Sequence, residues 1–210
     1  MSTNPLSIQQ INRFVGNIDL YLLDQILKDR FDATKPLLDA GCGEGRNLTY
    51  FINAGYEAYG IDRQADALRM LGFIARQLSP GYPADRFQAA SVEQLPYPDA
   101  HFGTVVCSAV LHFAESEEHF WTMCEELNRV LAPGGVIFIR MASIMGLDLE
   151  TKPEDNGRHW LPDGSIRFLL TREHWNTWQS KFDWEPVDHL KVVSVDQQRG
   201  MATAVLRKKG

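Results

Sequence analysis

The sequence predicts an α/β fold, built as a doubly wound sheet of seven strands that is mostly parallel and ends in an antiparallel hairpin strand. Three observations support this prediction. Strand-like and helix-like segments alternate as far as residue 141. The apolar run at Leu37–Leu38 leads into glycines on alternate positions, as where a buried parallel strand turns into a helix. Two β-rich runs, 187–195 and 201–207, are separated by only five residues, which predicts a hairpin.

The N-terminal segment, residues 1–34, is expected to be helical. Apolar residues between Ile18 and Leu27 recur at helical spacing, and Asn17 precedes them as a possible cap. This pattern predicts one helix over 17–31, before the sheet begins.

The alternating segment follows, and glycine and proline mark the ends of its helices at 54–55, 79–83 and 133–135. Strands alternating with helices favour a parallel sheet with right-handed crossovers. The expected elements are strand 37–40, helix 45–53, strand 57–61, helix 64–78, strand 86–90, strand 103–107, helix 116–131 and strand 136–141.

Beyond residue 141 the alternation lapses. Residues 142–170 contain several prolines and glycines, so we expect mostly loop there. Long loops inside compact domains are usually functional, and the aromatic residues Trp160 and Phe168 favour an ordered lid over a substrate. A helix over 171–182, capped by Thr171, leads into the terminal hairpin.

Composition restricts the class of protein. A chain of 210 residues, 44% hydrophobic and 23% charged, is expected to form one globular domain over 1–210. A net charge of −6 argues against a nucleic-acid partner. The three cysteines lack metal-site spacing and favour reduced thiols in a cytoplasmic protein without a metal. No signal core or apolar run of membrane-spanning length occurs, so no membrane association is expected. We expect a monomer or homodimer.

The glycine run carries the most specific signal. Its spacing differs from the dinucleotide fingerprint G-x-G-x-x-G, and no Lys-Ser/Thr follows, which excludes a Walker phosphate loop. Residues 39–45, Asp-Ala-Gly-Cys-Gly-Glu-Gly, resemble motif I of the class I S-adenosylmethionine-dependent methyltransferases. That resemblance implies a Rossmann-like fold with a reversed last strand, and S-adenosylmethionine as cofactor. It assigns cofactor contacts to Asp39, Gly41, Cys42, Gly43 and Gly45.

Asp62 follows the second predicted strand, about twenty residues after the glycine run, where a carboxylate binds ribose hydroxyls. The alternative is that Asp62 only caps the helix that begins at Gln64. Arg63 either stacks on adenine or faces solvent.

Residues 90–99 resemble the family segment G-D-x-x-x-L-P-F-P-D, which lies against adenine. Ser91 stands where the family usually has an acid. Adenine recognition then falls to Ser91 and Val92, to Glu93, or to backbone groups. The prolines themselves indicate a turn.

The segment 107–113 resembles the family's x-N-x-x-L-H-x at the end of the fourth strand. The resemblance places Ser108 beside the methionine part of the cofactor and His112 toward the acceptor as a catalytic base. A packed, structural histidine is the alternative. Residues 126–135 match E-x-x-R-V-L-x-P-G-G, a structural motif that ends a helix.

Candidate acceptor-binding residues lie in the predicted lid and near the crevice. Arginines there suit an anionic or carboxylated acceptor, because guanidinium groups pair with oxyanions; scattered surface charge is the alternative. The candidates are Arg46, Arg140, His159, Trp160 and Arg167.

These observations predict an enzyme that transfers a methyl group from S-adenosylmethionine to a small-molecule acceptor by in-line SN2 displacement. A regulatory protein that binds the cofactor without turnover is the first alternative. A nicotinamide-dependent dehydrogenase is the second, and both the glycine spacing and the terminal hairpin disfavour it.

Overall fold

A computed structural model describes residues 5–145 and 152–210. Its central sheet has the strand order β10-β11-β5-β4-β1-β2-β3, and β9 adds an eighth strand beside β11. β11 runs antiparallel to β5, β9 and β10, and all other pairs in this sheet are parallel, so the mostly parallel sheet with one reversed strand is confirmed. The strands are β1 Leu37–Ala40, β2 Ala58–Asp62, β3 Phe87–Ala89, β4 Phe102–Ser108, β5 Leu131–Ala142, β9 Trp184–Pro186, β10 Lys191–Val195 and β11 Arg199–Lys208.

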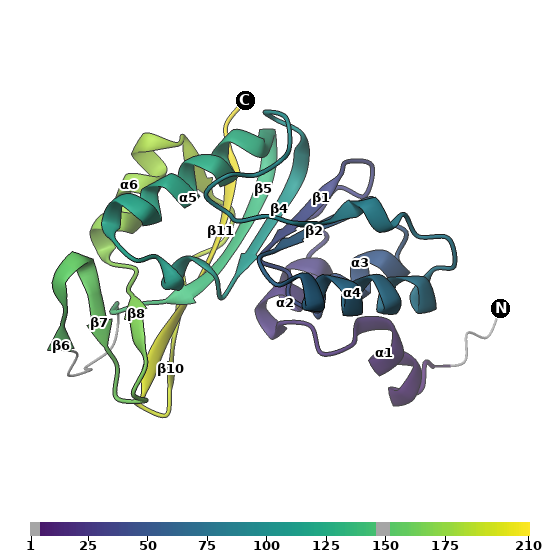
Figure 1. Ribbon diagram of the computed structural model, residues 1–210, viewed down its shortest axis with the longest axis horizontal. Coiled ribbons are helices and arrows are strands. Elements are labelled where there is room, and N and C mark those ends of the chain that lie inside the picture. The colour runs from purple at the N-terminus through teal and green to yellow at the C-terminus, as the bar shows by residue number, and fades with distance from the viewer. Residues whose placement is uncertain (1–4, 146–151) are drawn as a thin grey trace.

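Helices cover both faces of this sheet, as Figure 1 shows. Alternate strand residues face opposite layers: Leu38 and Ile137 pack with α5 and α6, whereas Leu37 and Phe138 pack with α2, α3 and α4. The α-helices are α1 Ile8–Val15, α2 Leu20–Leu27, α3 Thr49–Asn53, α4 Ala65–Leu78, α5 Glu117–Val130 and α6 Arg172–Lys181. Short 3₁₀ turns are η1 Ala84–Arg86, η2 Leu111–Phe113 and η3 Asp155–Gly157.

The N-terminal prediction is partly wrong. The helix predicted over 17–31 is shorter, α2 at Leu20–Leu27, and a further helix, α1, precedes it. The cap of α2 is Asp19, whose side chain accepts from the amides of Tyr21 and Leu22, and not Asn17. The first helix, α1, begins with a capping box between Ser7 and Gln10, a signal readable from the sequence.

The helix predicted over 45–53 is also shorter than expected. Gly45 has φ +82°, a left-handed conformation that cannot continue an α-helix. The helix therefore starts only at Thr49, and the residues before it form turns around the carboxyl end of β1.

The segment 142–170, predicted to be mostly loop, also contains strands that the prediction missed. Three short antiparallel strands form a separate sheet: β6 Lys152–Pro153, β7 Arg158–Trp160 and β8 Ile166–Phe168. Phe168 is buried and stacks on Phe120 of α5 at 4.8 Å between ring centroids. Figure 1 shows this small sheet beside β10, at the end of the central sheet where β5 also finishes. Residues 146–151 of the predicted lid lie outside the described residues.

None of the helices in the described ranges is long and apolar enough to cross a membrane.

Candidate cofactor and acceptor site

Two adjoining pockets lie where the parallel strands end. The first has a volume of about 480 Å³ and the second about 350 Å³, and Gly41 and Asp62 line both. Carboxyl ends of parallel strands are the usual ligand crevice of an open α/β sheet. The first pocket includes the predicted residues Arg63, Ser91, Val92 and Glu93; the second includes Cys42, Gly43, Arg46 and Ser108.

The three glycines of the run have different surroundings. A Cβ on Gly41 would lie 2.3 Å from Cγ2 of Val110, so this position allows β1 and the β4–η2 connection to approach closely. A Cβ on Gly45 would lie 2.3 Å from Cδ1 of Leu71, and Gly45 lines neither pocket. Gly45 therefore serves packing against α4. Gly43, at φ +52°, faces open space in the second pocket.

Asp62 joins the end of β2 to this loop. One carboxylate oxygen accepts the Gly43 amide at 2.8 Å, and the other accepts the Gln64 amide at 2.9 Å. The alternative that Asp62 binds the start of the following helix is thus part of the structure. It does not exclude a ligand, because each carboxylate oxygen has a second lone pair and Asp62 lines both pockets.

Asp39 is buried near the end of β1, just before the glycines that line the second pocket. Neither of its carboxylate oxygens has a hydrogen-bond partner among the described residues. Burial raises the pKa of Asp39 to about 7, with Arg46 opposing that rise and Asp62 adding to it. The hydroxyl of Ser108, which lines the second pocket, is buried and unpartnered as well. Buried polar atoms are normally hydrogen-bonded, so this end of the site lacks a donor.

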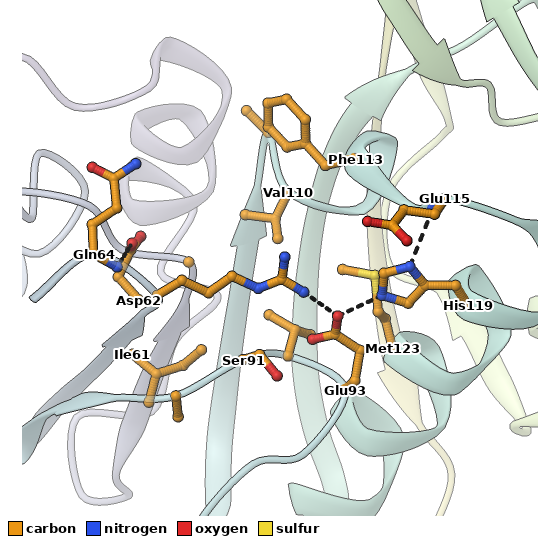
Figure 2. Close-up of a pocket in the computed structure, with 15 residues that line it drawn as sticks. Ile61, Asp62, Gln64, Ser91, Glu93, Val110, Phe113, Glu115, His119 and Met123 are labelled. Carbon is orange, nitrogen blue, oxygen red and sulfur yellow. Dashed lines mark hydrogen bonds and ion pairs between the residues drawn. The ribbon is translucent and has the colours of Figure 1, made fainter.

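Glu93 organises the far wall of the first pocket. Its Oε1 pairs with Arg63 and lies 2.5 Å from Nε2 of His119, and Figure 2 shows Glu93 and His119 facing each other. Although burial raises the pKa of Glu93, hydrogen bonds, including those from Ser91 and His119, and the charge of Arg63 hold it below its usual value. Arg63 therefore pairs with an acid in this structure instead of only facing solvent. The second oxygen of Glu93, Oε2, is buried without a partner among the described residues.

His119, on α5, is a site residue that the sequence prediction missed. Its Nδ1 accepts the amide of Glu115 at 3.1 Å, so in the neutral ring the proton lies on Nε2 and is donated to Glu93. In the sequence His119 stands out only as a polar residue three positions after Ser116, the cap of α5. That position does not indicate a pocket.

The turn that carries this wall is held from behind by α5. Arg129 donates to the carbonyl oxygens of Tyr97 at 2.7 Å and Leu95 at 2.9 Å, while Glu126 accepts the Leu95 amide at 2.8 Å. The structural role predicted for the segment 126–135 thus includes fixing the turn at Leu95 and Tyr97.

Two predicted acceptor-binding arginines converge on one acid that the sequence prediction did not select. The buried carboxylate of Asp19 lies 3.2 Å from Arg140 and 3.5 Å from Arg46. The guanidinium of Arg140 also lies 5.4 Å from the ring centre of Tyr21. Asp19 directly precedes an apolar helix, which is a cap signal, but nothing local points to Arg140 on β5.

His112 lies on η2, behind the first pocket, and lines neither pocket. Its Nδ1 accepts the Ala142 amide at 3.2 Å. Burial and, to a smaller extent, the positive charges of Arg167, Arg199 and Arg140 lower the pKa of His112 to about 4. The imidazole is therefore neutral near pH 7. The guanidinium of Arg167 lies 4.9 Å from the ring centre of Phe113, which lines the first pocket.

Two further acceptor candidates lie on β7. His159 is half-buried, and burial lowers its pKa. Trp160 is 43% exposed and lines a separate surface hollow with Lys152, Leu161 and Pro162. The described structure does not bring Trp160 to either cofactor-side pocket.

The residues at these pockets fit a nucleoside that carries an amino acid. Donors are missing beside Asp39 and Ser108, where a cationic amine would supply them, and an acceptor is free at Glu93, where an exocyclic amine would use it. Fold and site together define an α/β protein that binds a nucleoside cofactor at the ends of parallel strands.

Comparison with known proteins specifies this class. A family model described as a methyltransferase domain matches residues 38–139. On the basis of this match and of related sequences and structures, the chain belongs to the class I S-adenosylmethionine-dependent methyltransferase family. It is an enzyme of that class.

Three of these similar proteins are informative. A 2-heptyl-1-hydroxyquinolin-4(1H)-one methyltransferase from Mycobacteroides abscessus is 27% identical over 70% of this chain and 76% of its own length. A methyltransferase structure from Methanosarcina mazei has a TM-score of 0.71 at 20% identity, covering 88% and 97% of the two chains. The 1,6-didemethyltoxoflavin-N1-methyltransferase of Burkholderia thailandensis, solved with its acceptor and S-adenosylhomocysteine, has a TM-score of 0.69 at 17% identity, covering 96% and 82%. The chain spans 41% or less of the next two curated relatives.

Proposed function

We propose that this methyltransferase transfers the methyl group of S-adenosylmethionine to a small-molecule acceptor by in-line SN2 displacement. The observation that carries the proposal is the order of polar side chains with spare acceptor capacity along two adjoining pockets. Ser108 lines one end, where buried Asp39 precedes the glycine run, Asp62 lies where the pockets meet, and Glu93 lies at the other end. That order matches an amino acid, a ribose and a nucleobase joined in one molecule.

Each residue then has a role that its chemistry suits. Asp39 and Ser108 accept hydrogen bonds from the ammonium group, and Asp62 accepts from the ribose hydroxyls. Glu93 accepts from the exocyclic amine of adenine, while Val92 packs against the base. The backbone at Cys42 and the open face of Gly43 contribute contacts to the amino-acid part, although the Cys42 amide itself donates to the carbonyl oxygen of Ile61.

When bound, S-adenosylmethionine supplies a methyl group on a positively charged sulfur that is already activated for displacement. The protein contributes alignment of the acceptor with that methyl group. Such orientation lowers barriers by about 7–11 kcal/mol in well-aligned systems. A base is needed only where the acceptor atom must lose a proton before it can attack.

A small acceptor is supported by the names of two similar proteins, which methylate a hydroxyquinolone and didemethyltoxoflavin. Arg46, Arg140 and Arg167 are the acceptor-side cations that we propose to contact it. The small sheet over 152–168 would cover this side as a lid. A cytoplasmic location and a monomeric or homodimeric state stay predictions.

Calorimetry tests the cofactor assignment. Wild-type protein is expected to bind S-adenosylhomocysteine saturably, and Asp39→Ala and Asp62→Ala to lose measurable binding. Asp66→Ala is the matched control, because Asp66 is an exposed acid on α4 whose partner is Arg69. Absence of binding by the folded wild type, or equal binding by Asp62→Ala, would rule the proposal out.

A protein that retains the cofactor without turnover remains a second candidate function. The observation that favours it is the engagement of Nδ1 of His112 by the Ala142 amide, which leaves no evident base. Screening a metabolite library for release of S-adenosylhomocysteine separates the two. Acceptor-dependent release supports the enzyme, whereas tight cofactor binding with no release from any acceptor supports the second function.

A further inference from the structure

We propose that His112 and Arg167 form a subsite that binds an oxyanion of the methyl acceptor, with His112 acting as a hydrogen-bond donor through Nε2 and not as a base. This proposal rests on the proposed function and specifies its substrate class. It assigns the acceptor a negatively charged oxygen at neutral pH, such as a carboxylate or an acidic hydroxyl.

The backbone fixes which nitrogen of His112 carries the proton. The Ala142 amide at the end of β5 donates to Nδ1 at 3.2 Å, so the Nδ1 lone pair is occupied. A neutral imidazole has one donor and one acceptor nitrogen, and therefore Nε2 bears the hydrogen. Taking up a second proton at Nδ1 would leave the buried Ala142 amide facing a donor, which is unfavourable.

The charges around the ring point the same way. Arg140 on β5, Arg167 on β8 and Arg199 on β11 all disfavour a second positive charge on His112. Two of these arginines already have carboxylate partners: Asp19 lies 3.2 Å from Arg140, and Asp163 lies 3.5 Å from Arg199.

Arg167 differs from the other two. Within residues 5–145 and 152–210 it forms no ion pair; it donates to the carbonyl oxygen of Ile166 at 2.7 Å and lies over the Phe113 ring at 4.9 Å. Phe113 is 58% exposed and lines the first pocket, so Arg167 lies near the pocket mouth. The ring of His112 also lies against Phe113, at 4.6 Å between ring centroids, so Phe113 is flanked by a half-buried guanidinium and an imidazole. A guanidinium and an N–H donor are groups that bind an oxyanion.

An anionic acceptor also removes the need for a base. The electron pair of the acceptor oxygen forms the new bond to the methyl carbon, and the electron pair of the breaking carbon–sulfur bond stays on sulfur. The negative oxygen and the positive sulfur both become neutral, and no proton has to be removed. The absence of a free lone pair on His112 is then consistent with turnover.

Nuclear magnetic resonance of ¹⁵N-histidine-labelled full-length protein tests the tautomer directly, with His112→Gln used for assignment. The expected spectrum has the proton of His112 on Nε2 and shows no protonation of the ring between pH 8 and pH 5.5. A ring protonated on Nδ1, or one that titrates near pH 6.5, would overturn the donor role whether or not the cofactor binds.

The oxyanion subsite is tested on the same resonance with acetate and benzoate as probes, and acetamide and benzamide as neutral matches. Both acids should shift Nε2 of His112, both amides should not, and Arg167→Gln should weaken acid binding at least tenfold. Arg158→Gln is the control, because Arg158 lies on the same small sheet but pairs with Glu154. Equal shifts from acids and amides, no shift from either acid, or unchanged binding in Arg167→Gln would overturn the subsite. Calorimetry with S-adenosylhomocysteine on the same samples reports separately on the proposed function.

Discussion

The carboxylate of Asp62 accepts a hydrogen bond from the amide of Gly43 at 2.8 Å, which ties the end of β2 to the glycine run after β1. The other oxygen of Asp62 accepts the Gln64 amide at 2.9 Å. One side chain thus sets the position of two loops that line both pockets, and it uses one lone pair of each carboxylate oxygen to do so.

Asp62→Asn is therefore expected to harm both loops despite its similar size. A carboxamide has only one acceptor oxygen, so its NH₂ group must face one of the two backbone amides. We expect S-adenosylhomocysteine affinity to fall about 10- to 100-fold and unfolding free energy to fall by about 1–3 kcal/mol. Calorimetry and urea unfolding measure the two effects. Asp66→Asn should change neither, and affinity unchanged in Asp62→Asn would contradict this role.

Asp39 predicts a pH dependence of stability. Its pKa is about 7 in the folded protein against 3.8 for an ordinary aspartate, so the folded state holds this proton more tightly than the unfolded state. Its contribution is fully present below about pH 4 and is lost as the pH rises through about 7. The ligand-free protein should lose up to about 4 kcal/mol of stability across this interval through Asp39. Urea unfolding at pH 5 and pH 8 measures the change.

Asp39→Asn is the control for that interval, because a neutral amide has no proton to lose there. The variant should show a smaller decline between pH 5 and pH 8 than the wild type. The cation of S-adenosylmethionine should also bind the ionised form of Asp39, so wild-type affinity should increase with pH through about 7. An identical pH profile of stability in the wild type and Asp39→Asn would contradict the assignment.

The parts of this site that the sequence predicted are those set by local pattern. Asp39, the glycine run and Asp62 follow from where strands end and helices begin, and the structure places Gly41, Gly43 and Asp62 at the pockets. A buried parallel strand has a recognisable apolar run, so the alternating core was predictable as well.

The parts that the sequence did not predict depend on contacts between distant segments. Glu93 meets His119 across 26 residues of sequence, and Asp19 on the N-terminal side of α2 meets Arg140 on β5. No spacing rule connects such pairs. The strands β6 to β8 were missed because two- and three-residue strands are too short to show an alternating pattern.

Glu93 predicts how the site selects its nucleobase. If Oε2 of Glu93 accepts the exocyclic amine of adenine, S-inosylhomocysteine, which has a carbonyl oxygen there, places two acceptors together. Wild-type protein should bind S-adenosylhomocysteine about 10- to 100-fold more tightly than the inosyl analogue. Glu93→Gln, which offers both a donor and an acceptor, should reduce that preference. Competitive calorimetry measures both ratios, and an unchanged preference in Glu93→Gln would assign selection to Ser91 or the backbone.

Arg129 offers a test of how much the contacts behind the Glu93 wall of the first pocket contribute to stability and binding. Its guanidinium reaches two backbone carbonyls of the turn and pairs with Glu126 three residues earlier on α5. Arg129→Ala leaves both carbonyls and the partly buried Glu126 without their donor. We expect a loss of about 1–3 kcal/mol in unfolding free energy by urea titration, and weaker S-adenosylhomocysteine binding because the turn is no longer fixed.

Arg69 is the matched comparison, because it forms an ion pair of the same i,i+3 spacing with Asp66 on the exposed face of α4. That pair has no contact with a backbone carbonyl and is open to solvent, so Arg69→Ala should change stability by less than about 0.5 kcal/mol. Equal effects of the two substitutions would mean that the carbonyl contacts of Arg129 contribute nothing beyond a surface ion pair. A large effect on stability with cofactor affinity preserved would instead separate the fold of the turn from the shape of the pocket.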